Sequence, residues 1–402
     1  MRWFGRAALA RERVRGPADR FSPRFVVAGR RGNVPAASHR VGPSGVAPSR
    51  RVGRAVIHMA AVDAEQARLA GLARGVRAAV VVPSLFALGL LVIRQPEAAG
   101  LAVFGTFAHL VMVDYDPDGR TRSLQCGVLT LLGAVTVGVG TLISPYAWVA
   151  LVGTMAIGFC SEVPLLARSR LAVLAPALLL SFMLGVATPA PASVVLPHLA
   201  GWLLAGVAAQ PVLLVLWIPL RTVGLTHAER AQRAASHPWL ANAASTGAAL
   251  GLAIVVTRLF GVAHQFWIVL GVLPVLSAKS ASATRTFWHE QAGTVLGFLV
   301  GAALVAVIGT NQTWYWLVLP WVVFASAYAS TALGFVAGQA ALTVFAVILF
   351  GILAPRQEAV GLVRVEDIAI GGAISLAVGA VQQLGRAGSR AVGGGRRAAP
   401  ER

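Results

Sequence analysis

The stretch HQFWIVLGVLPVLSAKSASATRTFWHEQAGTVLGFLVGAALVAVIG, residues 264–309, contains two apolar runs separated by a short polar turn. The turn carries Lys279, Arg285, His289 and Glu290. Each run, together with its flanks, is long enough to form a helix that crosses a bilayer. The stretch therefore predicts two membrane helices joined by a charged turn.

Glycine recurs every four residues in the second run, at Gly293, Gly297 and Gly301. This spacing puts the three positions on one helical face, where the lack of side chains lets a second helix approach closely. We expect a helix-packing face here, and we expect Gly127 to be its counterpart in the first half of the chain.

A second stretch, LAVFGTFAHLVMVDYDPDGRTRSLQCGVLTLLGAVTVGVGT at residues 101–141, repeats the order of apolar run, charged turn and apolar run. Identical residues in the two halves share one offset of 166 without a gap: Gly105 and Gly271, Gly127 and Gly293, Trp148 and Trp314, Gly185 and Gly351, Pro189 and Pro355, Gly206 and Gly372. Because Gly, Pro and Trp have specific backbone and interfacial roles, their agreement indicates a tandem duplication.

The composition predicts an all-α polytopic integral membrane protein. Hydrophobic residues make up 57% of the 402 residues and charged residues only 12%, against about 25% charged residues in soluble domains. The richness in Arg, Ala, Gly, Val and Pro favours a bacterial source.

The net charge of +19 would suggest a nucleic-acid partner in a soluble protein. Here thirteen arginines precede His58, and most of the others lie in short loops and in the C-terminal tail. Because basic residues are retained on the cytoplasmic side of membranes, we expect a lipid bilayer around the chain and no nucleic acid.

The residues suggest no cofactor, no metal site and no enzyme. Cys126 and Cys160 lie in apolar runs, where small buried hydrophobic side chains are expected, and no Cys/His spacing suits a metal. No phosphate-binding loop, nucleophile elbow or zinc helix is found, so the chain is not a self-contained ATP-driven pump.

The ends of the chain differ from its apolar centre. Residues 1–58 are basic and polar without a sustained period, which favours disorder; alternatively, Met59 is the true start. The remaining predicted parts are an amphipathic lead-in at 59–75, a first six-helix membrane repeat at 76–220, a cytoplasmic linker at 221–241, a second six-helix repeat at 242–384 and a basic cytoplasmic tail at 385–402.

Twelve apolar segments are predicted to be helices, some of them shorter than the ~20 residues of a full span. They are Val76–Ile93, Ala98–Val113, Leu124–Ile143, Tyr146–Val163, Leu171–Ala187, Leu196–Leu220, Asn242–Gly261, Gln265–Ser277, Gln291–Gly309, Trp314–Ser330, Leu333–Leu353 and Glu366–Leu384. Prolines inside these runs are expected to kink them: Pro83, Pro176, Pro211, Pro274 and Pro320.

The basic residues favour cytoplasmic N- and C-termini, in a bacterial inner membrane. With the N-terminus inside, fourteen basic residues of the loops and the C-terminal tail fall on the inner side and four on the outer side. Six crossings per repeat would give both repeats the same orientation.

Charged and titratable residues at membrane depth are the best functional candidates, because each costs ~2.5–3.5 kcal/mol at a helix centre. Candidates for an anion pathway are Arg258, Lys279, Arg285 and Arg364, and candidates for proton coupling are His109, Glu162 and Glu290. Each also has a structural interpretation: boundary anchors for the basic residues and Glu162, a buried hydrogen-bonded side chain for His109, and helix capping for Glu290. Glu366 and Asp367 suit a helix N-terminus.

The sequence DYDPDG at residues 114–119 resembles the opening of a calcium loop. It has the D-x-D-x-D-G spacing but lacks the distal glutamate that completes such a loop. We expect an acidic turn on the inner side of the membrane.

The second half resembles the fusaric-acid-resistance and aromatic-acid-exporter superfamily. The residues that carry the resemblance are Phe266–Leu270, the turn through Arg285, the run Gly293-Thr294-Val295-Leu296-Gly297, and Arg364–Asp367 with Gly371 and Gly372. The resemblance implies an all-helical secondary exporter of small organic anions, often aromatic carboxylates. The alternatives are an anion channel of similar architecture and a non-transporting envelope factor; a homo-oligomer is possible for each.

Overall fold

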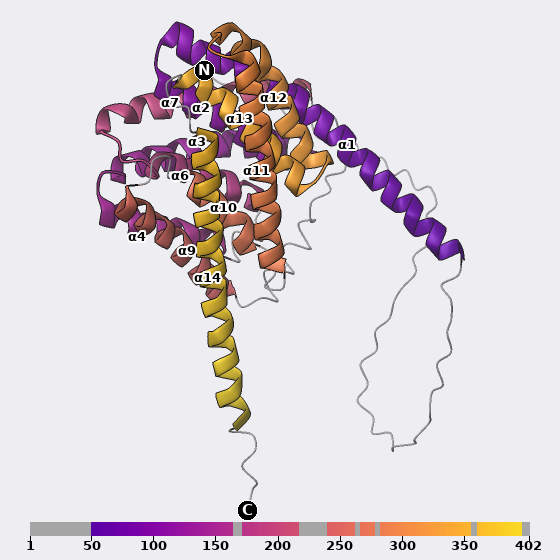
Figure 1. Cartoon of the computed structure of the whole chain (residues 1–402), viewed down its shortest axis with the longest axis vertical. Coiled ribbons are helices and arrows are strands. Elements are labelled where there is room, and N and C mark those ends of the chain that lie inside the picture. Colours follow the sequence, from indigo (N-terminus) through magenta and orange to yellow (C-terminus); the bar gives the residue numbers. More distant parts are fainter. Residues whose placement is uncertain are drawn as a thin grey trace, which may run out of the picture. The chain divides into compact units, whose positions relative to one another are not determined.

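A computed structural model describes residues 50–163, 171–216, 239–261, 266–277, 282–354 and 360–395. In these residues the regular structure is helical throughout. The first half contains α1 (Arg50–Ala87), α2 (Pro96–Phe107), α3 (Gly119–Ile143), α4 (Ala147–Ser161), α6 (Ala175–Val186) and α7 (Val195–Val215). The second half contains α9 (Trp239–Phe260), α10 (Phe266–Ser277), α11 (Ala283–Ile308), α12 (Gln312–Ala332), α13 (Phe335–Leu353) and α14 (Val360–Gly395) (Figure 1).

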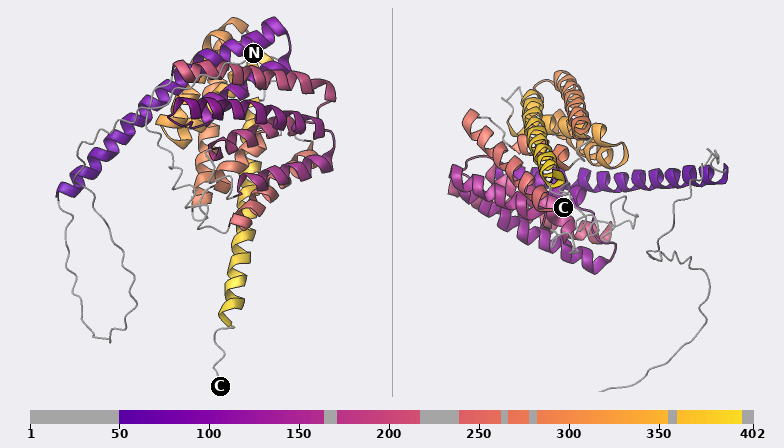
Figure 2. Two further views of the ribbon diagram at one scale, coloured as in Figure 1. Left: turned by 180° about the vertical axis from the view of Figure 1, so that it is seen from behind. Right: turned by 90° about the horizontal axis from the view of Figure 1, so that it is seen from below.

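Four short elements join or extend these helices. Two π-helical turns, Leu88–Ile93 and Ala108–Met112, continue α1 and α2, and two 3₁₀ turns, Ala172–Leu174 and Ala192–Val194, precede α6 and α7. The α14 helix continues past the other helices at its C-terminal end, as both Figure 1 and the reverse view in Figure 2 show.

Seven helices of the described part of the chain are long and apolar enough to cross a membrane. Four shorter apolar helices lie between them: Pro96–Met112, Ala147–Ser161, Ala172–Val186 and Phe266–Val275. The protein is therefore an all-α membrane protein, and each of the twelve predicted apolar segments overlaps one of the described helices.

The predicted helix starts were wrong where a polar stretch precedes an apolar one. The α11 helix begins at Ala283 rather than near Gln291, and α14 begins at Val360 rather than at Glu366. Apolar residues mark the part of a helix that meets lipid, whereas backbone hydrogen bonding continues through Ala, Arg and Glu, which are good helix formers. Likewise α1 begins at Arg50 and continues through the stretch that was expected to be a separate lead-in.

The five prolines that were expected to kink helices lie at different positions in them. Pro83, Pro211, Pro274 and Pro320 lie inside α1, α7, α10 and α12. Pro176, which was expected to kink a run, instead lies in the first turn of α6. The N–H groups of the first turn of a helix have no intrahelical acceptor, so a proline at this position removes no helix hydrogen bond.

Within each half, the second helix packs on the sixth and the third packs on the fifth: α2 on α7 and α3 on α6, then α10 on α14 and α11 on α13. Glycine permits the close approach in both halves. A Cβ at Gly105 would lie 2.9 Å from the Cβ of Ala205, and a Cβ at Gly371 would lie 3.1 Å from the carbonyl carbon of Gly271. Such contacts leave no room for any larger residue.

Across the halves, each fourth helix packs on the first helix of the other half. On α4 and α9, Gly158 lies against Gly247 and Leu250, and Met155 lies against Gly251. On α12 and α1, Tyr328 lies against Gly71 and Phe324 against Gly75. The residue order in both contacts shows that the paired helices are antiparallel.

Candidate functional site

Five charged side chains are buried in the part of the chain that the structure describes: Arg77, Arg122, Glu290, Arg364 and Asp367. Arg77 bonds to the Ala73 carbonyl of its own helix, and Arg122 bonds to the carbonyls of Leu213 and Pro117, near the ends of α7 and α3. The other three come from α11 and α14 and lie together, so they form the strongest candidate for a functional site.

Arg364 is fully buried, with none of its surface exposed. Its guanidinium carbon lies 4.0 Å from the centre of the Trp267 ring on α10, a cation–π contact. Its Nε donates a 3.0 Å hydrogen bond to the hydroxyl of Thr343 on α13. Within the described residues, neither Nη atom has a hydrogen-bond partner.

Two carboxylates act electrostatically on Arg364: Glu290 from α11 and Asp367, one turn further along α14. Glu290 has no exposed surface, and neither of its oxygens has a hydrogen-bond partner among the described residues. Asp367 is 1% exposed, and its Oδ2 also has no partner there. Neither carboxylate lies close enough to Arg364 to form an ion pair in the described structure.

We call Arg364, Glu290, Asp367, Thr343 and Trp267 the Arg364 centre. Taking ions out of water costs several kcal/mol per ion unless hydrogen bonds compensate. The guanidinium and the carboxylates of the centre nevertheless keep free hydrogen-bonding capacity in the interior. Such a set can bind a carboxylate through two parallel N–H donors and can carry a proton on a carboxyl group.

Close helix packing holds the centre in place. A Cβ at Gly371 would lie 2.1 Å from the Ile268 carbonyl oxygen, and Ser375 donates a 2.8 Å hydrogen bond to the Val272 carbonyl. These contacts fix α14 on α10, so that Arg364 meets Trp267. On the other side, a Cβ at Gly297 would lie 2.3 Å from the Ala340 carbonyl oxygen, which fixes α11 on α13.

An aromatic cluster adjoins the centre and joins the two halves. Trp267 lies 6.1 Å from Phe104 of α2, 5.1 Å from Phe266 and 6.2 Å from Phe350 of α13, measured between ring centres. Phe107 of α2 stacks on Phe345 of α13 at 6.2 Å. The side of the centre that faces the first half is therefore aromatic.

Arg258, a candidate for the anion pathway, bonds to helix ends. Its Nη2 donates to the backbone carbonyls of Ser144 at 2.9 Å and Val186 at 3.2 Å. Ser144 follows α3 and Val186 ends α6, so a cation here meets the partial negative charge at two helix C-termini. These contacts tie α9 to the first half, and Arg258 is not among the charges that act on Arg364.

The remaining cationic candidates lie elsewhere. Arg285 is exposed in the first turn of α11, and Lys279 lies outside the described residues. Neither belongs to the Arg364 centre. Among the described residues, Arg364 is the one predicted pathway cation that is fully buried, whereas Arg258 is half-buried and, of its buried atoms, only Nε lacks a partner there.

The proton-coupling candidates also have different surroundings. Glu290 was expected at a helix N-terminus; it lies inside α11 because that helix begins at Ala283. His109 is buried, with Nδ1 2.7 Å from the Gly105 carbonyl oxygen and Nε2 3.2 Å from the Thr130 hydroxyl. Both ring nitrogens are thus engaged, one with α2 and the other with α3, and the ring lies 5.2 Å from the Trp202 ring of α7.

Glu162 follows α4, and its side chain accepts a 3.4 Å hydrogen bond from the Thr246 hydroxyl of α9. Burial of the carboxyl group in the α4–α9 contact raises its pKa, and the Thr246 hydrogen bond opposes that shift. The Glu162 side chain still reaches the surface, at the end of the helix pair rather than inside the bundle.

Sequence reasoning missed three parts of the centre. Asp367 was assigned to a helix N-terminus, and Trp267 and Thr343 were given no role at the site. One signal was present: Arg364 and Asp367 are three residues apart, which places them on one helical face. The contacts with Trp267 and Thr343 depend on tertiary packing and have no local signal.

The acidic sequence at residues 114–119 forms a turn whose side chains have structural partners. Asp114 pairs with Arg74 of α1. Asp118 caps α3 by accepting a 2.8 Å hydrogen bond from the Thr121 N–H, which lowers the pKa of the Asp118 carboxyl. Asp116 accepts a hydrogen bond from the Asp118 N–H.

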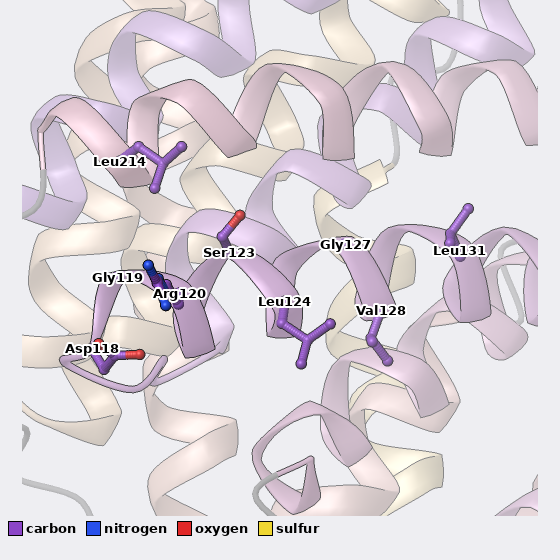
Figure 3. A pocket seen from close by; sticks show the side chains of 9 residues that line it. All are labelled: Asp118, Gly119, Arg120, Ser123, Leu124, Gly127, Val128, Leu131 and Leu214. Carbon is purple, nitrogen blue, oxygen red and sulfur yellow. The ribbon is translucent and has the colours of Figure 1, made fainter. Parts of the chain in front are cut away.

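An open groove lies along α3 beside this turn (Figure 3). Its volume is about 870 Å³, and its lining is mainly apolar, with Leu124, Val128 and Leu131 from α3 and Leu214 from α7. Among the described residues, no atom lies within 4 Å of a Cβ placed at Gly127. The close packing predicted at Gly127 is therefore not found among the described residues; α6 begins at Ala175, and residues 164–170 before it lie outside the described part.

The close packing predicted for the three glycines of α11 is found in the structure. A Cβ at Gly293 would lie 2.6 Å from the Val336 carbonyl oxygen, and one at Gly301 would lie 3.2 Å from a methyl group of Val347. Together with Gly297 these residues line the contact of α11 with α13, which begins at Phe335 and covers the whole glycine face.

The helices and the buried charges define an integral membrane protein with a polar centre in its second half. A family model described as "Fusaric acid resistance protein-like" matches residues 252–378, a range that includes every residue of the Arg364 centre. Over these residues, the match confirms the resemblance seen in the sequence. No curated protein and no solved structure gave a significant match.

Proposed function

We propose that this protein is a secondary transporter that exports small organic anions, with aromatic carboxylates as the preferred class. The observation that carries the proposal is Arg364: a fully buried guanidinium, with both Nη atoms unpaired among the described residues, inside the family-matching region. The family description, which refers to resistance to an organic acid, agrees with this chemistry.

The geometry of the centre favours a carboxylate ligand. Thr343 holds the guanidinium through Nε, and this leaves the planar Nη pair for the two oxygens of one carboxylate. The aromatic cluster of Phe104, Phe266, Trp267 and Phe350 beside it suits a flat apolar body. A small aromatic acid has both parts.

We also propose that the twelve helices are twelve crossings, arranged as two tandem six-helix repeats at 76–220 and 242–384 with a linker at 221–241. Two observations support this. The helix pairs within each half correspond in order, and the Gly105–Ala205 contact has its counterpart, at the same offset of 166, in Gly271–Gly371. The reciprocal contacts of α4 with α9 and α12 with α1 support a common ancestral unit.

The distribution of basic residues supports a bacterial inner membrane with both termini in the cytoplasm. In that orientation, the acidic turn at residues 114–119 and the first turn of α11 lie at the inner surface. In the same orientation, the basic flanking parts at 1–58 and 385–402 lie on the cytoplasmic side.

The direct test is transport by the full chain in liposomes. Radiolabelled benzoate, a small aromatic carboxylate, is loaded inside, and its exit is compared with exit from protein-free liposomes. Arg364→Gln removes the charge; because hydrogen bonds to charged groups contribute about 1.5–3 kcal/mol, we expect roughly 10–100-fold weaker binding and a matching loss of flux.

Two further variants separate charge from geometry. Arg364→Lys keeps the charge but lacks the planar pair of donors, and we expect it to restore only part of the flux. Arg285→Gln removes an exposed arginine of α11 and should leave the flux unchanged. Equal flux in the wild type and in Arg364→Gln would refute the proposal, and ion currents of channel size would point to an anion channel instead.

A further inference from the structure

The Arg364 centre contains one guanidinium and two carboxyl groups. The helices packed around Glu290 are α10, α13 and α14. In their described residues, α10 and α13 contribute no charged side chain, and α14 contributes Arg364, Asp367 and the exposed Glu366. The other two charged residues of α14, Arg386 and Arg390, lie about six turns or more beyond Arg364 along the helix. The charge balance of the buried centre therefore depends on Arg364, Glu290 and Asp367.

An anion cannot enter this centre without a change in that balance. Arginine stays protonated in proteins, so the centre has one positive charge and up to two negative charges. If both carboxyl groups were ionised, an entering carboxylate would bring the net charge to minus two in the interior, where unpaired charge is most costly. Proton uptake by the carboxyl groups removes that penalty.

The structure indicates which carboxyl group responds. Both oxygens of Glu290 lack a partner among the described residues, and Glu290 lies on a different helix from Arg364. Asp367 has one such oxygen, shares α14 with Arg364 and is next to the exposed Glu366. Because the charge of Arg364 acts on Glu290, and neither Glu290 oxygen has a hydrogen-bond partner among the described residues, Glu290 is the group left without compensation when an anion takes up the guanidinium.

We propose that the Arg364 centre binds an organic anion and a proton together, with the anion on the guanidinium of Arg364 and the proton on the carboxyl group of Glu290. The proposal rests on the proposed function and adds its coupling group. No bond other than O–H is formed: the proton comes from solvent, and it leaves when the anion leaves. Binding is therefore tighter at lower pH, about tenfold per pH unit while one proton is taken up.

The experiment is calorimetric titration of the purified full chain in lipid nanodiscs with benzoate. Titrations in buffers of different ionisation enthalpy give the number of protons taken up with each anion. We expect about one proton per benzoate in the wild type and about none in Glu290→Gln, a variant of nearly the same shape that resembles the protonated state. Glu290→Gln should still bind benzoate, with an affinity that no longer depends on pH.

Glu366→Gln removes an exposed carboxyl group next to the centre and is the matched control, which should retain the proton uptake. Loss of proton uptake in Asp367→Asn but not in Glu290→Gln would overturn the inference. Benzoate flux without any proton uptake on binding would overturn this inference and leave the proposed function intact. Equal proton uptake in the wild type and in Glu290→Gln would also overturn it. Absence of both binding and flux would refute the proposed function itself, and this inference with it.

Discussion

Arg364 and Thr343 are joined by a 3.0 Å hydrogen bond from the guanidinium Nε to the threonine hydroxyl, although they lie on different helices. Thr343 Oγ1 also donates at 2.9 Å to the Gln339 carbonyl of its own helix. The hydroxyl is therefore fixed before it accepts from Arg364, and it sets the direction of the guanidinium.

The first prediction concerns Thr343→Val, which keeps the shape of the side chain and removes the hydroxyl. Losing a hydrogen bond to a charged group costs about 1.5–3 kcal/mol, so we expect benzoate to bind at least tenfold more weakly by calorimetry. Thr331→Val is the control, because Thr331 Oγ1 bonds only to Ala327 of its own helix in the described structure. Equal affinities for the two variants would show that Thr343 does not position Arg364.

The second prediction separates Arg258 from the transport site. Arg258→Gln loses the bonds to Ser144 and Val186, so we expect a clear fall in the unfolding temperature, corresponding to about 1–3 kcal/mol. Flux per folded molecule should stay near the wild-type value, since Arg258 contacts helix ends and not the Arg364 centre. A stable Arg258→Gln protein without flux would instead place Arg258 in the pathway.

The third prediction compares two glycines at equivalent positions of the proposed repeats. Gly293→Ala puts a methyl group 2.6 Å from the Val336 carbonyl oxygen, and overpacking of this kind costs about 1–3 kcal/mol. Gly127→Ala meets nothing within 4 Å among the described residues, and it should stabilise α3 by about 0.5–1 kcal/mol because alanine is the better helix former. Thermal unfolding in nanodiscs measures both changes, and shifts of the same sign would contradict the different packing of α3 and α11.

The fourth prediction is a pH dependence of stability at Glu162. Burial raises the pKa of this carboxyl in the folded protein above its ordinary value, so the folded state holds the proton more tightly than the unfolded state. Stability is therefore greatest at acid pH and falls as the pH rises from the ordinary carboxyl range through the raised folded pKa. Glu162→Gln should unfold at a higher temperature than the wild type at neutral pH, with little difference under acid conditions.

Asp118→Asn is the comparison, because the stability that Asp118 contributes has the opposite pH dependence. The pKa of Asp118 is lowered by the Thr121 N–H, so its contribution is present at neutral pH and is lost as the pH falls. If Glu162→Gln raised the unfolding temperature by the same amount at every pH, the effect would come from packing and not from the charge of Glu162.

The sequence predicted the helices well and the site only in part. The apolar runs located all twelve segments, since burial in lipid demands an apolar surface over a fixed length. They did not locate the starts of α11 and α14, and Glu290 and Asp367 were therefore placed at helix ends rather than inside. Trp267 and Thr343 join the centre only because α10 and α13 pack beside α14, and no pattern within one helix records that contact.

The antiparallel contact between α1 and α12 also affects synthesis of the protein. Gly71 and Gly75 leave the ribosome long before Tyr328 and Phe324, the residues that later cover them. A nascent first half therefore waits in the bilayer with one side of its leading helix against lipid, until translation of the second half supplies the missing neighbour.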